Sequence, residues 1–291
     1  MITLERAVMH ASELTGSKLP RSIVIRPPSG WASLGLRELG EYRELLYFLT
    51  KRELQIRYKQ SLFGVSWAVL QPVALAFIFT IFFGVLADIP SEGIPYPVFA
   101  LAALTPWLFV SQTVAQSALS LVGDANLLSK VYFPRLVIPL AKTFALLVDL
   151  AVGLVVVVII AVLYGHPPGV EVLALPAFLA LGLLTGAGLG ILLAAVNVHY
   201  RDVAVAVPLF MQVWLFATPV IYPGSLVEGS WRYVFALNPM TSVVEGSRWT
   251  LLGASAPELV PVLISTAVAL TIFVGALVYF RRTELYFADV V

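Results

Sequence analysis

The chain contains no cysteine, little charge and no phosphate-binding loop. Without cysteine it has no disulfides and no thiolate metal ligands, and its redox compartment cannot be inferred. Only 12% of its 291 residues are charged, about half of the roughly 25% that is typical of soluble domains. A water-exposed surface of this size would be badly under-charged. The composition therefore excludes an ordinary soluble protein and favours one whose surface faces lipid.

The patterns of several kinds of active site are also missing. No Gly-Lys-Ser or Gly-Lys-Thr sequence occurs, so the chain cannot hold a nucleotide in a phosphate loop. The histidines, His10, His166 and His199, lack metal-ligand spacing, and no paired carboxylates indicate glycosyl chemistry. The net charge of +1 argues against nucleic-acid binding. We therefore predict no catalytic residues, no metal and no cofactor bound by this chain.

Hydrophobic residues, in contrast, make up 59% of the chain and gather in six stretches. A helix that crosses a membrane needs about 20 apolar residues. We therefore predict an all-α integral membrane protein with six transmembrane helices near residues 63–87, 97–122, 136–164, 172–196, 203–222 and 259–280. The predicted domains are a cytoplasmic N-terminal segment, residues 1–60, and a six-helix transmembrane domain, residues 61–291.

The lysines and arginines predict how these spans are oriented. Of the 18, ten precede Phe63, three lie before or just inside span three, one lies between spans four and five, and two follow span six. All of these fall on one side of the predicted membrane, whereas Arg232 and Arg248 fall on the other. Because basic residues gather in cytoplasmic loops, we predict that both termini are cytoplasmic.

Residues 37–60 predict an amphipathic helix before the first span. Apolar side chains recur there at helical spacing, at Leu39, Tyr42, Leu46, Leu49 and Ile56. Such a helix can lie in the cytoplasmic membrane interface with basic residues beside anionic lipid. It is either a membrane anchor alone or also a docking surface for a cytoplasmic partner. The residues singled out on this interface helix are Tyr42, Arg43, Arg52 and Arg57.

Two features inside the spans have a structural and a functional interpretation. Gly182, Gly186 and Gly190 share one face of span four and allow close helix packing, either within the chain or across a dimer.

Asp149 lies deep in span three, where a carboxylate is costly and suggests function. We find no chain of such groups, so we expect a satisfied structural residue facing the bundle interior. Lys142 can extend to the cytoplasmic interface and needs no special role.

The segment between spans five and six has apolar runs that are too short to cross a membrane. Asn238-Pro239 can divide it into two short helices, which gives a pair of re-entrant helices that dip back toward the bilayer. Aromatic residues at this depth are either interface anchors or contacts for sugar rings. The residues that we predict to line a substrate path or gate are Trp107, Trp214, Tyr222, Trp231, Tyr233, Asn238, Pro239 and Trp249.

Five ordered sequence blocks resemble those of the ABC-2-type polysaccharide export permeases. The blocks read RYKQSLFGVSWAVLQP from Arg57, NLLSKVYFPR from Asn126, NVHYRD from Asn197, ATPVIYP from Ala217, and LNPM from Leu237 followed by EGSRW. The resemblance covers the chain from about Ile23 to its end and leaves the role of residues 1–22 open.

This resemblance implies a homodimeric permease in the bacterial cytoplasmic membrane, paired with two copies of a separate ATPase subunit that binds ATP and Mg²⁺. The permease would export lipid-linked polysaccharide such as O-antigen, capsule or teichoic acid. The loop at residues 126–135 would be the coupling helix, and residues 222–249 would be the gate helices. The residues implied to face the ATPase are Asn126, Leu127, Lys130, Tyr132, Phe133, Arg135, His199, Arg201 and Asp202.

The sequence leaves three other functions open. An ABC permease could carry a drug or a small lipid instead. A secondary transporter should show more buried charges than Asp149, and a polyprenyl-sugar transferase should show clustered carboxylates at one interface.

Overall fold

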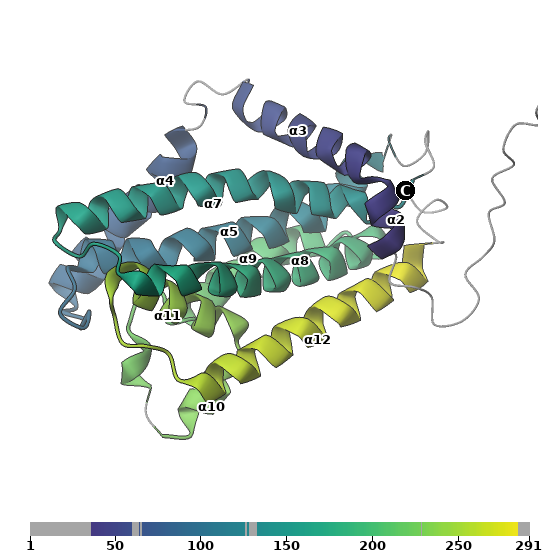
Figure 1. Ribbon diagram of the computed structural model, residues 1–291. Coiled ribbons are helices and arrows are strands. Elements are labelled where there is room, and N and C mark those ends of the chain that lie inside the picture. The colour runs from purple at the N-terminus through teal and green to yellow at the C-terminus, as the bar shows by residue number, and fades with distance from the viewer. Residues whose placement is uncertain are drawn as a thin grey trace, which may run out of the picture. The chain divides into compact units, whose positions relative to one another are not determined.

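The computed structural model describes residues 36–59, 64, 66–125, 127, 133–227 and 229–284. Within these ranges every regular element is a helix and no strand occurs, as the sequence predicts. Helices α5 (Tyr96–Gly123), α7 (Val137–Leu163) and α8 (Leu175–His199) run side by side, with α12 (Leu259–Thr283) crossing beside α8 (Figure 1).

Five helical segments are long and apolar enough to cross a membrane. Each has 21 to 30 residues, which meets the requirement of about 20. Two are composite: α4 (Ser66–Phe79) continues into the π-helical η1 (Thr80–Leu86), and the 3₁₀ turn η2 (Val170–Ala174) leads into α8. The five segments are Ser66–Leu86, Tyr96–Gly123, Val137–Leu163, Val170–His199 and Leu259–Thr283, and they match five of the six predicted spans.

The remaining predicted span, residues 203–222, contains a shorter helix than expected. Helix α9 (Val203–Phe216) has 14 residues and extends about 21 Å at 1.5 Å per residue. The hydrocarbon core of a bilayer is about 30 Å thick. The chain turns at residues 217–222 and does not continue the helix.

Helix α5 forms the centre of the bundle, and the glycine face of α8 packs directly against it. A Cβ on Gly190 would lie 2.7 Å from the Cβ of Ser117, and one on Gly186 would lie 3.2 Å from the Cγ2 of Thr113. Such close approaches are what small residues allow between membrane helices. All three glycines of that face are buried, so its role is packing within the chain and not contact across a dimer.

The predicted interface helix is present as α2 (Leu36–Glu41) and α3 (Arg43–Lys59), and α3 lies along α7 (Figure 1). Leu49 is buried, and Tyr42 and Leu46 pack against the same apolar cluster. Ile56, predicted to lie on this face, is 60% exposed. The packed stripe therefore ends near Leu49, because the last turns of α3 extend past the apolar cluster.

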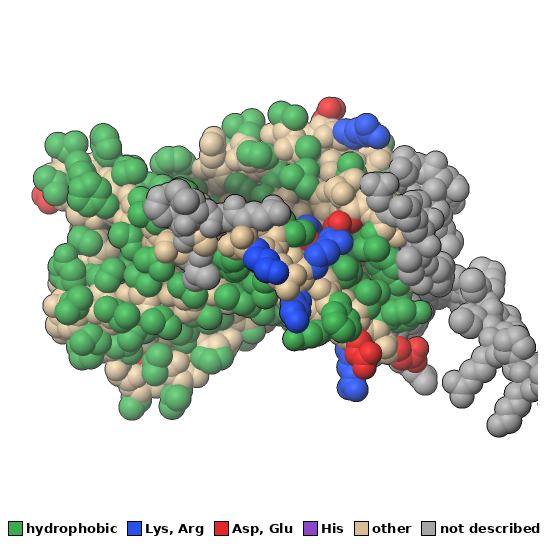
Figure 2. All heavy atoms as spheres, turned by 90° about the horizontal axis from the view of Figure 1, so that it is seen from above, with side chains coloured by type: hydrophobic (Ala, Val, Ile, Leu, Met, Phe, Trp, Pro, Cys, Tyr) green, Lys and Arg blue, Asp and Glu red, His purple; other side chains and the backbone are tan. Residues whose placement is uncertain are grey.

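Outside the core, the bundle exposes large apolar side chains. Val85, Leu163 and Val205 are 70%, 77% and 79% exposed, which is unfavourable in water but suits a bilayer. Charged side chains gather on one half of the face shown in Figure 2, and the other half shows many hydrophobic and almost no charged side chains. This division is what a helix bundle with one end outside the hydrocarbon requires.

Candidate functional site

Two described residues of the predicted coupling loop, Leu127 and Phe133, lie in one apolar cluster with α3 and the end of α12. Phe133 is 5% exposed and packs in the cluster with Val198 and Phe280, and Leu127 contacts it. We call the end of the bundle that holds this cluster the α2 end. Asn126, Lys130 and Tyr132, also predicted for this loop, lie outside the described residues. In the single chain the Phe133 ring is therefore buried and not presented to a partner.

Arg135 connects the same loop to the end of α12. Its backbone N–H donates to Glu284 Oε1 at 2.9 Å, and its guanidinium donates to the Glu284 carbonyl at 2.7 Å. Arg281 of α12 forms an ion pair with the same carboxylate, at 2.9 Å. A displacement of the loop would therefore act directly on α12.

The second predicted ATPase-facing element is the turn between α8 and α9. His199, Arg201 and Asp202 are exposed there, and Val198 just before them belongs to the apolar cluster that contains Phe133. The structure therefore brings both predicted elements to the α2 end.

The basic residues of α3 differ in what they contact. Arg43 is exposed, whereas Arg52 forms ion pairs with Glu53 at 2.8 Å and with Asp124, the residue that follows α5, at 2.6 Å. Arg57 forms an ion pair with Asp149 of α7. Two of the predicted interface arginines thus bind acids of the protein and not lipid phosphate.

Lys142 of α7 also has a specific partner, contrary to the interpretation that it merely extends to the interface. Its ammonium lies 2.5 Å from Glu53 Oε2 and 3.9 Å from Asp124 Oδ2. Burial alone would raise the pKa of Glu53, but hydrogen bonds from Lys142 and Arg52 outweigh it and lower that pKa. These groups form an ion-pair network that joins α3, α5 and α7.

At the opposite end, the predicted pair of short helices is present as α10 (Trp231–Ala236) and α11 (Pro239–Leu252). Asn238 caps α11, because its side-chain oxygen accepts from the Met240 N–H at 3.1 Å. The same oxygen accepts from the Trp214 indole at 3.0 Å. Asn238 therefore ties α11 to α9, and Pro239 occupies the favoured first helical position.

The aromatic residues predicted to line a path fall into two groups. Trp107 is 3% exposed and packs edge-on against Trp214, while Trp249 packs against Phe178. Trp107 therefore belongs to the packed core, whereas Trp214 and Trp249 are partly buried. Trp231 and Tyr233 on α10, in contrast, are 65% and 52% exposed, and Tyr222 lies in the chain reversal before α10.

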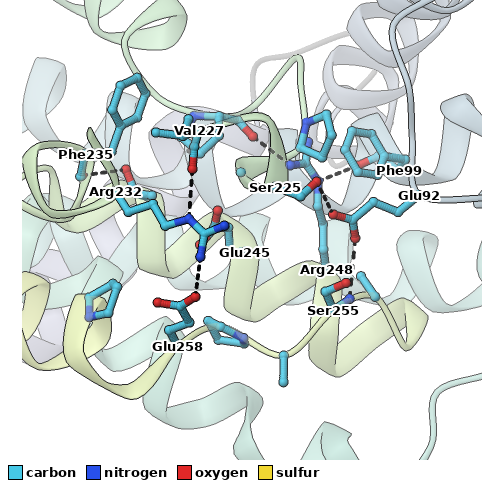
Figure 3. Close-up of a pocket in the computed structure, with 18 residues that line it drawn as sticks. Glu92, Phe99, Ser225, Val227, Arg232, Phe235, Glu245, Arg248, Ser255 and Glu258 are labelled. Carbon is cyan, nitrogen blue, oxygen red and sulfur yellow. Dashed lines mark hydrogen bonds and ion pairs between the residues drawn. The ribbon is translucent and has the colours of Figure 1, made fainter. Parts of the chain in front are cut away.

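A cavity of about 250 Å³ lies between α10, α11 and the loop before α12 (Figure 3). Arg232 and Glu258 form an ion pair across it, at 2.5 Å. Glu92 accepts a hydrogen bond from Ser225 at 2.8 Å. The wall therefore presents both signs of charge and hydrogen-bonding groups.

Glu245 of α11 also lines this cavity. Burial raises its pKa to about 7, although the positive charge of Arg248 opposes the shift. The carboxylate packs against Gly224, where a Cβ would collide with it. This carboxyl group therefore titrates near neutral pH.

Sequence reasoning placed Arg248 in an external segment and missed its structural role. Its side chain is 3% exposed. It donates to the carbonyls of Pro219 at 2.7 Å, Val220 at 2.6 Å and Tyr222 at 3.1 Å, and its guanidinium lies 3.5 Å from the Phe99 ring centroid. Arg248 thus holds the chain reversal after α9. The only sequence signal was its position three residues after Glu245 on a helix.

No group of three or more His, Cys, Asp or Glu side chains within the described ranges could hold a metal ion. The arrangement defines a multi-pass helical membrane protein with an ion-paired surface at one end and a short helix pair at the other.

The chain belongs to the ABC-2 type transporter family, whose model matches residues 44–252. It is 31% identical over 257 residues to the O-antigen export system permease protein RfbA of Myxococcus xanthus, with 87% of this chain and 98% of the relative covered. The RfbA protein of Klebsiella pneumoniae is 27% identical over 254 residues, covering 87% and 96%. The polysialic acid transport protein KpsM of Escherichia coli is 24% identical over 238 residues, covering 80% and 91%.

Proposed function

We propose that this chain is the membrane subunit of an ATP-driven exporter that moves lipid-linked polysaccharide, of the O-antigen, capsule or teichoic acid kind, across the bacterial cytoplasmic membrane. ATP is hydrolysed on a separate subunit, of which two copies pair with a homodimer of this chain. One observation carries the proposal: the chain aligns with 98% of the length of an O-antigen export permease.

The arrangement of the helix ends supports a sixth crossing with both termini cytoplasmic. Leu39 of α2 and Phe280 of α12 pack in the same apolar cluster, so both ends of the described helical region lie at the α2 end. Val198, at the end of α8, is in that cluster too, whereas Glu258 just before α12 lines the opposite cavity. We therefore propose that the chain crosses once more through α9 and the reversal that follows it.

The α2 end also provides the surface that an ATPase must contact. A motor subunit can move membrane helices only through elements it touches. The exposed turn His199–Asp202 and the loop that contains Arg135 lie at this end, and Arg135 is bonded to the end of α12. We propose that these two elements transmit the movement.

Complementation tests the proposal. The gene is deleted in the bacterium that encodes the chain, and surface polysaccharide is scored with the intact gene restored. Export is expected with the wild-type chain, and none when the phosphate-loop lysine of the partner ATPase is replaced. The purified chain alone is expected to hydrolyse no ATP.

The same strains discriminate the alternatives. If deletion leaves surface polysaccharide unchanged but abolishes drug resistance or the export of a small lipid, the result would favour another cargo. Loss of export in the Asp149→Asn variant, with export persisting under a dead ATPase, would favour a secondary transporter.

A further inference from the structure

Three glutamines are the only amide side chains in the sequences of α4 and α5, which contain no Asp, Glu, Lys, Arg or His, and all three lie in one row. Gln71 is in α4, and Gln112 and Gln116 are in α5. Gln112 Nε2 donates to Gln71 Oε1 at 3.0 Å, and Gln116 Nε2 donates to Gln112 Oε1 at 3.4 Å. We call these residues the glutamine row.

The row ends at the ion pair between α3 and α7. Arg57 donates to Gln116 Oε1 at 2.5 Å and also to Asp149. The charges at that end are therefore matched within the protein, and the rest of the row is neutral. An ionic ligand would find no unmatched charge along the row, whereas a neutral polar ligand would find donors and acceptors.

The glutamine row is not part of the packed core. It lines an open cavity of about 310 Å³ whose walls come from α3, α4, α5 and α7, and Gln71 is exposed. An amide within a membrane-crossing segment is unfavourable against lipid, because its donors and acceptor lose their hydrogen bonds to water. The row therefore faces water, a polar ligand or another protein surface.

An aromatic ring accompanies the amides. Trp67 lies one helical turn before Gln71, so both side chains point the same way, and Trp67 is 50% exposed and lines the cavity. An amide offers two donors and an acceptor, which match the hydroxyl groups of a sugar. The apolar face of an indole matches the C–H face of a sugar ring. A volume of about 310 Å³ is at the lower end of the roughly 300–1,000 Å³ of small-molecule sites.

We propose that the glutamine row and Trp67 form a binding site for neutral sugar units of the exported polymer, with the amides bonded to hydroxyl groups and the indole stacked on a ring. The proposal rests on the proposed function and adds the wall that contacts the cargo. It assigns this contact to α4 and α5, and not to Trp107, which is buried.

Leucine replacements test the role of the amides in export. The triple variant Gln71→Leu, Gln112→Leu, Gln116→Leu removes the hydrogen bonds while leaving apolar side chains that suit a membrane helix. Export is expected to fall by roughly tenfold or more, with normal membrane insertion and normal assembly with the ATPase. Gln55→Leu is the matched control, because Gln55 is an exposed glutamine on α3 outside the row, and it is expected to export normally.

Photo-crosslinking tests contact directly. p-Benzoyl-phenylalanine replaces Gln71 or, as a control, Gln55, in cells that make the polymer, and adducts are probed with antibody to that polymer. A polymer adduct at position 71 and none at position 55 is expected. An adduct with only a second copy of the chain, or normal export by the triple variant, would overturn the binding site and leave the proposed function intact. Failure of the wild-type chain to restore polymer export would instead overturn the proposed function.

Discussion

Arg57, near the end of α3, forms an ion pair with Asp149 in the middle of α7, and the Tyr58 hydroxyl donates to the other oxygen of the same carboxylate. Asp149 is therefore paired, as the sequence predicts, and its structural role stays a prediction. Its partners come from the interface helix, so Asp149 faces α3 and the adjoining cavity and not the centre of the bundle. This pairing fixes the end of α3 against a membrane-crossing helix.

Replacement of Asp149 distinguishes a role as an ion-pair partner from a role in proton transport. We expect Asp149→Asn to retain export, because asparagine can still accept from Arg57 and Tyr58. Asp149→Leu should lower the free energy of unfolding by about 3–5 kcal/mol, since it leaves the Arg57 charge uncompensated. Thermal unfolding in detergent and surface polysaccharide are the measurements. The double variant with Arg57→Leu should regain part of the loss, and no recovery would contradict the pairing.

The Glu53–Lys142 pair should make stability depend on acid pH. The pKa of Glu53 is lowered in the folded chain, so its contribution is present above the ordinary glutamate pKa and is lost as pH falls through the lowered value. A double-mutant cycle with Glu53→Gln and Lys142→Met should give a coupling energy of about 0.5–3 kcal/mol. Unfolding midpoints are compared with those of Glu44→Gln, a change at an exposed position of the same helix. A coupling energy of zero would refute the interaction between Glu53 and Lys142.

Glu245 should make stability depend on pH in the opposite direction to Glu53. Its pKa rises from 4.5 to about 7 on folding, so the stability linked to its protonation is fully present below pH 4.5 and is lost as pH rises through 7. Glu245→Gln should flatten the unfolding midpoint across this interval. An equally steep wild-type and variant profile would rule out Glu245 as the titrating group, and Glu41→Gln, at an exposed position of α2, is the control.

The two tryptophan environments predict different effects of truncation. Trp107→Ala should cost about 3–5 kcal/mol of stability because it leaves a cavity beside Trp214. Trp231→Ala removes a ring that is 65% exposed and should change stability by about 0.5 kcal/mol or less. If Trp231 lines the predicted gate, its loss should reduce export without changing the unfolding midpoint. Unchanged export would leave Trp231 as an interface anchor.

Arg135→Glu should uncouple ATP hydrolysis from export. The change removes the guanidinium bond to the Glu284 carbonyl and places a second carboxylate beside that of Glu284. Export per ATP should fall by roughly tenfold while insertion and ATPase assembly remain. Arg282→Glu, an exposed basic position on α12, is the matched control. Wild-type export by the Arg135 variant would count against the coupling role.

Helix positions could be predicted from the sequence because each long span is marked by its own apolar run. The α10–α11 pair was predictable too, since Asn238-Pro239 both ends one helix and caps the next. In residues 203–222 the sequence did not show where α9 ends, because the run stays apolar through the chain reversal, whose carbonyls accept hydrogen bonds from Arg248. Hydropathy does not record such a distant donor.

Pairings between distant segments could not be predicted from one sequence. Periodicity shows which face of a helix is polar, but not which residues of another helix lie opposite. The spacing of Gln112 and Gln116 marks a shared face of α5, yet nothing local indicates Gln71 as their neighbour. Likewise, Lys142 and Glu53 are 89 positions apart, and only the fold brings them together.

The carbonyl contacts of Arg248 have a mechanical consequence. A guanidinium is a rigid planar fork, and here it joins α11, the reversal after α9 and the start of α5, where it also donates to the Phe99 carbonyl at 3.3 Å. These parts must travel as one block during any opening of this end.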